Sequence, residues 1–164
     1  MLRSFRLGNH RSFDDEQELL LMPSLPSDAR VALPVTAIYG ANASGKSNLL
    51  DGLRFMRQAV LGSFSQWDAE GGVPRRPFRL APGSRSRPSA FVVELSVERV
   101  PYTFGFTVDD ERVREEWLYS YPEKRKRVLF ERDDEGISFG STVPEMKAKL
   151  DVLRELTRPN ALFL

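Results

Sequence analysis

The sequence predicts one α/β domain with a large antiparallel β component, and three observations lead to this prediction. A β-favouring run at residues 35–39 leads into a glycine-containing loop, and a segment with helical spacing follows. After residue 90, short β-favouring segments alternate with turn-forming residues. The length of 164 residues, of which 41% are hydrophobic, is sufficient for one domain with a buried core.

The N-terminal part, residues 1–62, is predicted to hold a β unit, a strand and a helix. Segments 2–7 and 17–22 are short and apolar-rich, as is typical of strands. Residues 35–39 (V-T-A-I-Y) are typical of a buried strand. Beyond them, apolar residues recur at three- and four-residue spacing, which predicts an amphipathic helix: Leu49, Leu50, Leu53, Met56, Ala59 and Val60.

The remainder divides into a loop, a meander and a helix. Residues 63–90 are rich in proline and arginine and are predicted to form a long loop, a kind of segment that is often functional. Residues 91–140 are predicted to form an antiparallel meander, with strands at 91–97, 102–108, 113–121, 127–131 and 137–139. Residues 144–157 are predicted to form a helix with proline near its first turn.

Composition and charge exclude several kinds of site. The 24 Lys+Arg and 23 Asp+Glu give a net charge of +1, which does not indicate a globally basic nucleic-acid binder. The absence of cysteine excludes a zinc ribbon and a cysteine nucleophile, and the single His10 argues against a multi-histidine metal site. No apolar run approaches the roughly 20 residues of a membrane helix, and no secretory signal is evident. We therefore expect a cytoplasmic protein.

Residues 40–47 match the phosphate-binding motif G-x-x-x-x-G-K-[ST] at every position, between a predicted strand and a predicted helix. Glycines let the backbone wrap a phosphate chain, and the start of the helix adds partial positive charge. The Lys46 side chain would reach the β- and γ-phosphates of ATP, and the Ser47 hydroxyl would ligate Mg²⁺. The predicted nucleotide-binding residues are Gly40, Ala41, Asn42, Ala43, Ser44, Gly45, Lys46, Ser47 and Asn48.

Three segments also carry a resemblance to known ATPases. The run F-R-L-G-N-H-R-S-F at 5–13, the motif G-A-N-A-S-G-K-S-N and the following L-L-D-G-L resemble ABC-type ATPases of the SMC/RecF/OLD kind. Still more similar are bacterial AAA-family ATP-binding proteins that are often associated with phage defence. This resemblance extends over most of the chain. It implies an α/β fold of the P-loop NTPase class: the N-terminal lobe of an ABC-type ATPase, residues 1–164, with an antiparallel β subdomain.

The resemblance also implies what ATP hydrolysis requires. In such families ATP lies between the P-loop of one head and a Ser-Gly-Gly signature loop of another, and a Walker B strand ends in Asp-Glu. Both elements belong to the second half of those proteins, and no Ser-Gly-Gly loop occurs up to Leu164. We therefore expect an incomplete lobe that binds ATP but hardly hydrolyses it alone. The expected partners are a second copy or a partner ATPase head, and an effector protein.

Two segments imitate a Walker B motif, and one glutamine is a candidate catalytic residue. Residues 106–111 (F-T-V-D-D-E) follow an alternating strand, which favours a hairpin turn at the carboxylates. Residues 128–131 (V-L-F-E) are interpreted as an ordinary strand end. Gln66 is a candidate for the Q-loop glutamine that contacts metal and water in ABC-type heads, and a surface loop residue is the alternative interpretation. Arg11 could approach the nucleotide phosphates, or it could be a solvated strand-end arginine.

Arginines in the predicted loop form a second candidate site. Such side chains neutralise nucleic-acid phosphates without reading sequence, and no acidic residue lies close to them along the chain. These residues are Arg75, Arg76, Arg79, Arg85 and Arg87. The basic run at 124–127 has acidic neighbours, so a solvated turn is the favoured interpretation there.

Two other functions compete with an ATPase lobe. In a non-hydrolysing interaction module, ATP would be a structural ligand or a switch, and turnover by the isolated chain would distinguish the two. The third alternative is a nucleotide kinase or GTPase. The absence of Asn-Lys-x-Asp argues against a GTPase, and the absence of an evident acceptor lid argues against a kinase.

Overall fold

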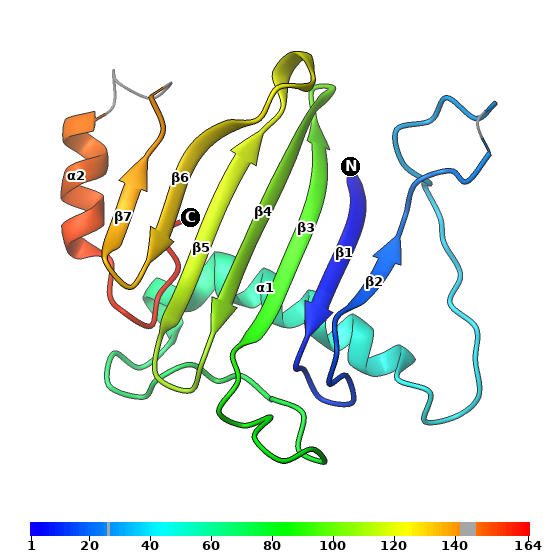
Figure 1. The fold of residues 1–164 in the computed structure, drawn as a ribbon, viewed down its shortest axis with the longest axis horizontal. Helices are drawn as coiled ribbons and strands as arrows, with labels where there is room; N and C mark the ends of the chain where they lie inside the picture. Colours follow the sequence, from blue (N-terminus) through cyan, green and yellow to red (C-terminus); the bar gives the residue numbers. More distant parts are fainter. Residues whose placement is uncertain (26, 142–146) are drawn as a thin grey trace.

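The computed structural model describes residues 1–25, 27–141 and 147–164, and in it a long helix lies across one face of a seven-stranded sheet (Figure 1). The strand order is β2-β1-β3-β4-β5-β6-β7, and each neighbouring pair is antiparallel. The elements in chain order are β1 (Leu2–Gly8), β2 (Gln17–Leu20), α1 (Lys46–Gln66), β3 (Ser89–Val97), β4 (Val100–Val108), β5 (Val113–Ser120), the short 3-10 helix η1 (Pro122–Lys124), β6 (Arg127–Asp133), β7 (Gly136–Phe139) and α2 (Lys147–Leu156).

The strands from β3 onward form a meander because short turns join them. Glu98 and Arg99 both take positive φ, 49° and 69°, as a two-residue hairpin turn between β3 and β4 requires. Between β4 and β5, the Asp109 carboxylate accepts the backbone N–H groups of Glu111 and Arg112 at 2.8 Å each. This side chain therefore closes a hairpin turn, and residues 109–111 are not the end of a Walker B strand.

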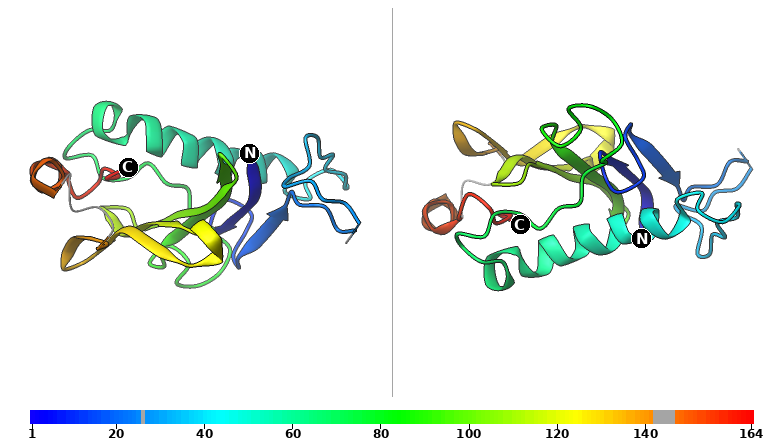
Figure 2. Two further views of the ribbon diagram at one scale, coloured as in Figure 1. Left: turned by 90° about the horizontal axis from the view of Figure 1, so that it is seen from above. Right: turned by 90° about the horizontal axis from the view of Figure 1, so that it is seen from below.

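The core lies between the sheet and α1, and Figure 2 shows the two layers edge-on. The inner-facing side chains of Phe5, Phe91 and Phe106 are fully buried. Phe91 is the centre of an aromatic cluster, with its ring centroid 4.9 Å from that of Phe55 and 5.4 Å from that of Phe106. The helix approaches closely because Gly52 has no side chain; a Cβ there would lie 2.8 Å from Leu7 Cδ1. Burial of this apolar face is what holds α1 on the sheet.

Residues 158–164, which we call the clasp, join the end of α1 to β5 of the sheet. The Arg158 guanidinium donates to the carbonyl oxygens of Ser63, Phe64 and Trp67, which end the helix. The fully buried Glu116 carboxylate of β5 accepts the N–H groups of residues 163 and 164 at 2.8 and 3.1 Å. Burial raises the pKa of Glu116, although these hydrogen bonds and Arg132 act in the opposite direction.

Residues 35–39 were predicted to be a buried strand, and this prediction is wrong for the structure. The segment pairs with no strand of the described chain, and Val35 and Tyr39 are 83% and 90% exposed. A β-favouring composition reflects how well side chains suit a half-buried pleated surface, and it provides no neighbouring strand by itself. The segment therefore runs over the surface to the glycine loop.

Two predicted boundaries also shift. Helix α1 continues to Gln66 because Ala59, Gly62 and Ser63 still pack toward the core, so the proline- and arginine-rich loop begins after it. Helix α2 spans Lys147–Leu156, whereas the predicted start at Pro144 lies outside the described residues.

Candidate functional site

The glycine loop, residues 40–45, meets the first turn of α1 in a conformation that only some residues can adopt. Gly45, the residue before the helix, has φ +94°, and Ala43 has φ +63°. A Cβ on Gly45 would lie 2.9 Å from Phe13 Cζ, so glycine is required there for two reasons. Gly45 has no side chain that could cap the first N–H groups of α1. These groups can therefore bind an anion.

Lys46 places its charge over this loop. Its ammonium group donates to the carbonyl oxygens of Gly40 at 2.8 Å and Ala41 at 2.6 Å, and lies 3.3 Å from Ser44 Oγ. The Ser47 side chain is exposed on the same first turn. The arrangement thus combines a cation, a hydroxyl and uncapped backbone donors within a few residues, which are the groups that a phosphate chain with Mg²⁺ requires.

The loop after β1 supports the first turns of α1. Asn48 donates through Nδ2 to Ser12 Oγ at 2.9 Å. One turn further along, the Arg11 guanidinium makes a two-point contact with the Asp51 carboxylate, with Nε–Oδ2 at 2.5 Å and Nη2–Oδ1 at 2.9 Å. His10 Nε2 lies 3.0 Å from Asp51 Oδ2. Arg11 is therefore bound to the helix beside the loop in this structure.

Two opposing effects set the charges of this cluster. Burial tends to raise the pKa of Asp51, but hydrogen bonds from Arg11 and His10 outweigh it and hold that pKa below its usual value. Burial lowers the pKa of His10, more than the neighbouring carboxylate raises it. At neutral pH the cluster consequently holds an ionised aspartate, a cationic arginine and a neutral imidazole. A small cavity of about 310 Å³ lies beside it, lined in part by Phe55, Trp67 and Arg76.

Gln66 lies far from the glycine loop. It is the last residue of α1 and lies twenty positions after Lys46, a distance of about 30 Å along the helix axis. Its side chain is exposed and packs beside Gly62. The structure therefore does not bring Gln66 together with the predicted nucleotide-binding residues.

The five arginines of the predicted loop do not form one exposed patch. The side chain of Arg75 is only 1% exposed, and it bonds to Asp110 at 2.7 Å and to the carbonyl oxygens of Arg85 and Arg87. Arg87 pairs with Asp14. Although no acidic residue lies close to these arginines along the chain, two aspartates from other parts of the chain lie beside them in the fold.

Four of the five arginines remain exposed: Arg76, Arg79, Arg85 and Arg87. The Arg87 side chain is half exposed although it pairs with Asp14, and Arg76 is 4.0 Å from the Asp51 carboxylate at its nearest approach. These exposed arginines are spread along a loop.

Sequence reasoning missed the residue that orders this loop. Asn9 is buried, takes φ +49° and donates from Nδ2 to the carbonyl oxygens of Ser84 and Arg87, while its Oδ1 accepts the N–H of Phe78. An asparagine directly after a glycine at a strand end is a signal for a left-handed turn, since asparagine tolerates positive φ. That signal could have identified the turn, but it could not have identified the bonds to a segment some 70 residues away.

Two other features were sought over the part of the chain that the structure describes. None of its helices is both long and apolar enough to span a bilayer. Nor do its histidine, aspartate and glutamate side chains gather into a group of three or more that could hold a metal ion.

Comparison with known families gives one match. Residues 35–159, which are more than half of the chain, match the family model described as "AAA domain, putative AbiEii toxin, Type IV TA system". No protein of curated function matches the sequence. The matched range contains the whole glycine loop, α1 and the meander.

Proposed function

The chain belongs to this family of AAA domains, and from this premise we propose that residues 40–48 bind Mg-ATP. An AAA domain implies a P-loop NTPase, and its family relationship supports ATP as the ligand, typically with Mg²⁺. The observation that carries the proposal is the position of the Lys46 ammonium group, 2.6–2.8 Å from the loop carbonyl oxygens of Gly40 and Ala41.

The residues of the loop have separate roles in this proposal. Phosphate oxygens would replace the two carbonyl oxygens as acceptors for Lys46, because they carry full negative charge and form stronger hydrogen bonds with an ammonium group. The N–H groups at the start of α1 would bind the phosphate nearest the helix. The Ser47 hydroxyl would contribute a ligand to Mg²⁺, which prefers oxygen donors. The Mg²⁺ would neutralise phosphate charge.

We further propose that the chain acts as the ATP-binding lobe of an ABC/SMC-like ATPase head, with a role in phage defence through an effector protein. The exposed segment 35–39 supports this proposal, because an apolar β-favouring run beside a nucleotide loop can pair with strands supplied from elsewhere. Hydrolysis would then require a Walker B carboxylate and a signature loop, brought by further sequence or by a second head. The family description itself names a toxin and a type IV TA system.

A titration with ATP and Mg²⁺ tests the nucleotide site directly. We expect Lys46→Ala to weaken ATP binding at least about 100-fold, since it removes the charge that the phosphates meet. Lys149→Ala on α2 is a matched control that removes an exposed lysine far from the loop in sequence, and it should bind like the unaltered chain. Equal ATP affinity of Lys46→Ala and the control would refute the proposed site.

One observation favours a non-hydrolysing module as the second candidate. Within the described residues, both Walker B-like segments belong to the antiparallel meander, and Asp51, the carboxylate nearest the loop in sequence, is paired with Arg11. A single-turnover assay with the isolated chain separates the candidates. ATP bound without turnover, both alone and with a complementary head, would favour the module, whereas turnover restored by a second head would favour the ATPase.

A further inference from the structure

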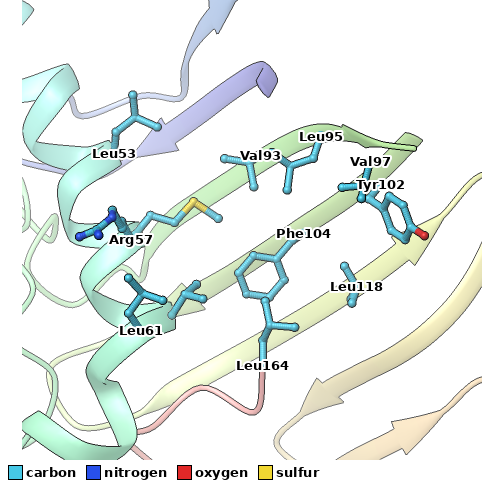
Figure 3. Close-up of a pocket in the computed structure, with 12 residues that line it drawn as sticks. Leu53, Arg57, Leu61, Val93, Leu95, Val97, Tyr102, Phe104, Leu118 and Leu164 are labelled. Carbon is cyan, nitrogen blue, oxygen red and sulfur yellow. The ribbon is translucent and has the colours of Figure 1, made fainter. Parts of the chain in front are cut away.

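A groove lies between α1 and the ends of β3, β4 and β5, on the same face of the sheet as the core (Figure 3). Its volume is about 570 Å³ and its lining is apolar, with Arg57 as the single charged residue among the described residues that line it. Two of its lining side chains are more than half exposed: Leu61 at 63% and Val97 at 52%. A contiguous apolar surface of this kind marks a binding site, whereas isolated exposed apolar residues do not.

The same chain carries an apolar helix face that is more than half exposed among the described residues. Helix α2 exposes Val152, Leu153 and Leu156 at 56%, 53% and 60%. Their spacing places them on neighbouring positions of one helical face, the arrangement by which an amphipathic helix inserts into a groove. Glu155 is exposed beside them.

The groove and the apolar face of α2 carry opposite charges, Arg57 in the groove and Glu155 on the helix. No carboxylate of the described chain lies within 4.0 Å of the Arg57 guanidinium, and Glu155 likewise has no cation within that distance among those residues. An acidic residue at the edge of an apolar helix would therefore complement the one charge in the groove.

Helix α2 cannot fill the groove of its own chain in this fold. It lies beside β7 at one edge of the sheet (Figure 1), and the clasp that follows it is bonded to Ser63 and Glu116. We propose that α2 of a second copy occupies the groove, with Glu155 against Arg57, and that the exchange is reciprocal about a two-fold axis. Each copy then buries both surfaces, as a symmetric dimer requires. The proposal does not depend on ATP or on the glycine loop.

Sedimentation over a range of concentrations, without nucleotide, tests this dimer. We expect the unaltered chain to dimerise, and Arg57→Glu and Glu155→Arg each to raise the dimer dissociation constant about tenfold or more. Combining the two changes should restore dimerisation. Arg85→Glu, which reverses an exposed charge on the loop at the other end of the sheet, should leave it unchanged.

A mixing experiment distinguishes a second copy from a foreign partner. Leu61→Asp damages the groove and Val152→Asp damages the helix, so each variant alone should be monomeric. Their mixture should form a heterodimer, because one undamaged groove then meets one undamaged helix. An unaltered chain that is monomeric throughout, a dimer that forms only with ATP, or a mixture that stays monomeric would each overturn the proposal.

Discussion

The sheet with α1 and the segment that leads into the glycine loop differ in what holds them. In the first region, Phe5, Phe91 and Phe106 are fully buried between two layers. In the second, Val35 and Tyr39 are almost fully exposed. The comparison teaches that the helix side of the glycine loop belongs to a packed core, whereas its upstream side has no such support within the described residues.

Hydrogen bonds show the same asymmetry. The helix side is connected to the loop after β1 through Asn48 and Ser12, and Phe13 packs on Gly45. On the upstream side, the bond from Leu33 N–H to the Leu21 carbonyl oxygen fixes the segment at its start. The stability of the fold should therefore depend strongly on the first region and weakly on the second.

Removal of a central core side chain should have the largest effect. Phe91→Ala deletes the ring that contacts Phe55 and Phe106, and we expect a loss of about 3–5 kcal/mol in the free energy of unfolding because a cavity remains. Urea denaturation measures this loss as a shift in the midpoint. A loss below about 1 kcal/mol would mean that the stability of the fold does not lie between sheet and helix.

A change at Asp51, on α1 next to the glycine loop, should have an intermediate effect on the free energy of unfolding, and this effect should depend on pH. Asp51→Asn removes the ion pair with Arg11 and should cost about 1–2 kcal/mol at neutral pH. The pKa of Asp51 is lowered from 3.8 in the fold, so its contribution is present above pH 3.8 and is lost as pH falls through the lowered pKa. The difference between Asp51→Asn and the unaltered chain should consequently shrink in acid.

Denaturation curves across this pH range provide the measurement. Asp15→Asn is the matched control, since Asp15 is exposed and has no ion pair in the described part of the chain. A difference for Asp51→Asn that grows in acid would contradict the assignment of an ionised Asp51 in the folded state.

A polar change in the exposed segment should have the smallest effect. Val35→Ser replaces a side chain that is 83% exposed, and we expect a change within about 0.5 kcal/mol in the free energy of unfolding. The same denaturation assay applies. A loss above about 1.5 kcal/mol would show that the segment is packed in solution and would remove the contrast between the two regions.

Local patterns predicted the elements that depend on local chemistry. The alternation at residues 102–108 matches β4, and Asp109 closes the turn that was favoured over a Walker B motif. The glycine loop meets a helix at Lys46, as its motif indicates. These features depend on residues close together in the chain, so sequence was sufficient.

Features that depend on distant partners were not predictable in this way. The burial of Arg75 depends on Asp110, which is 35 residues away. Without knowledge of that partner, the sequence of the arginine-rich loop predicts an exposed side chain. The distance of Gln66 from the loop depends on how far α1 continues, and α1 reaches Gln66 because Ala59, Gly62 and Ser63 pack toward the core. The exposure of residues 35–39 depends on a missing neighbouring strand, and β propensity carries no information about neighbours.

The clasp has a consequence for the order in which the molecule assembles. Its bonds from Arg158, Asn160 and Leu162 join residues that are 88 to 99 positions apart. Hairpins of the meander close over a few residues and can form early, whereas contacts of such long range form slowly. During synthesis on a ribosome, α1 emerges early, but its bonds to the clasp can form only after residues 158–162 have emerged. Its apolar face stays exposed until the strands of the sheet have emerged and paired beneath it.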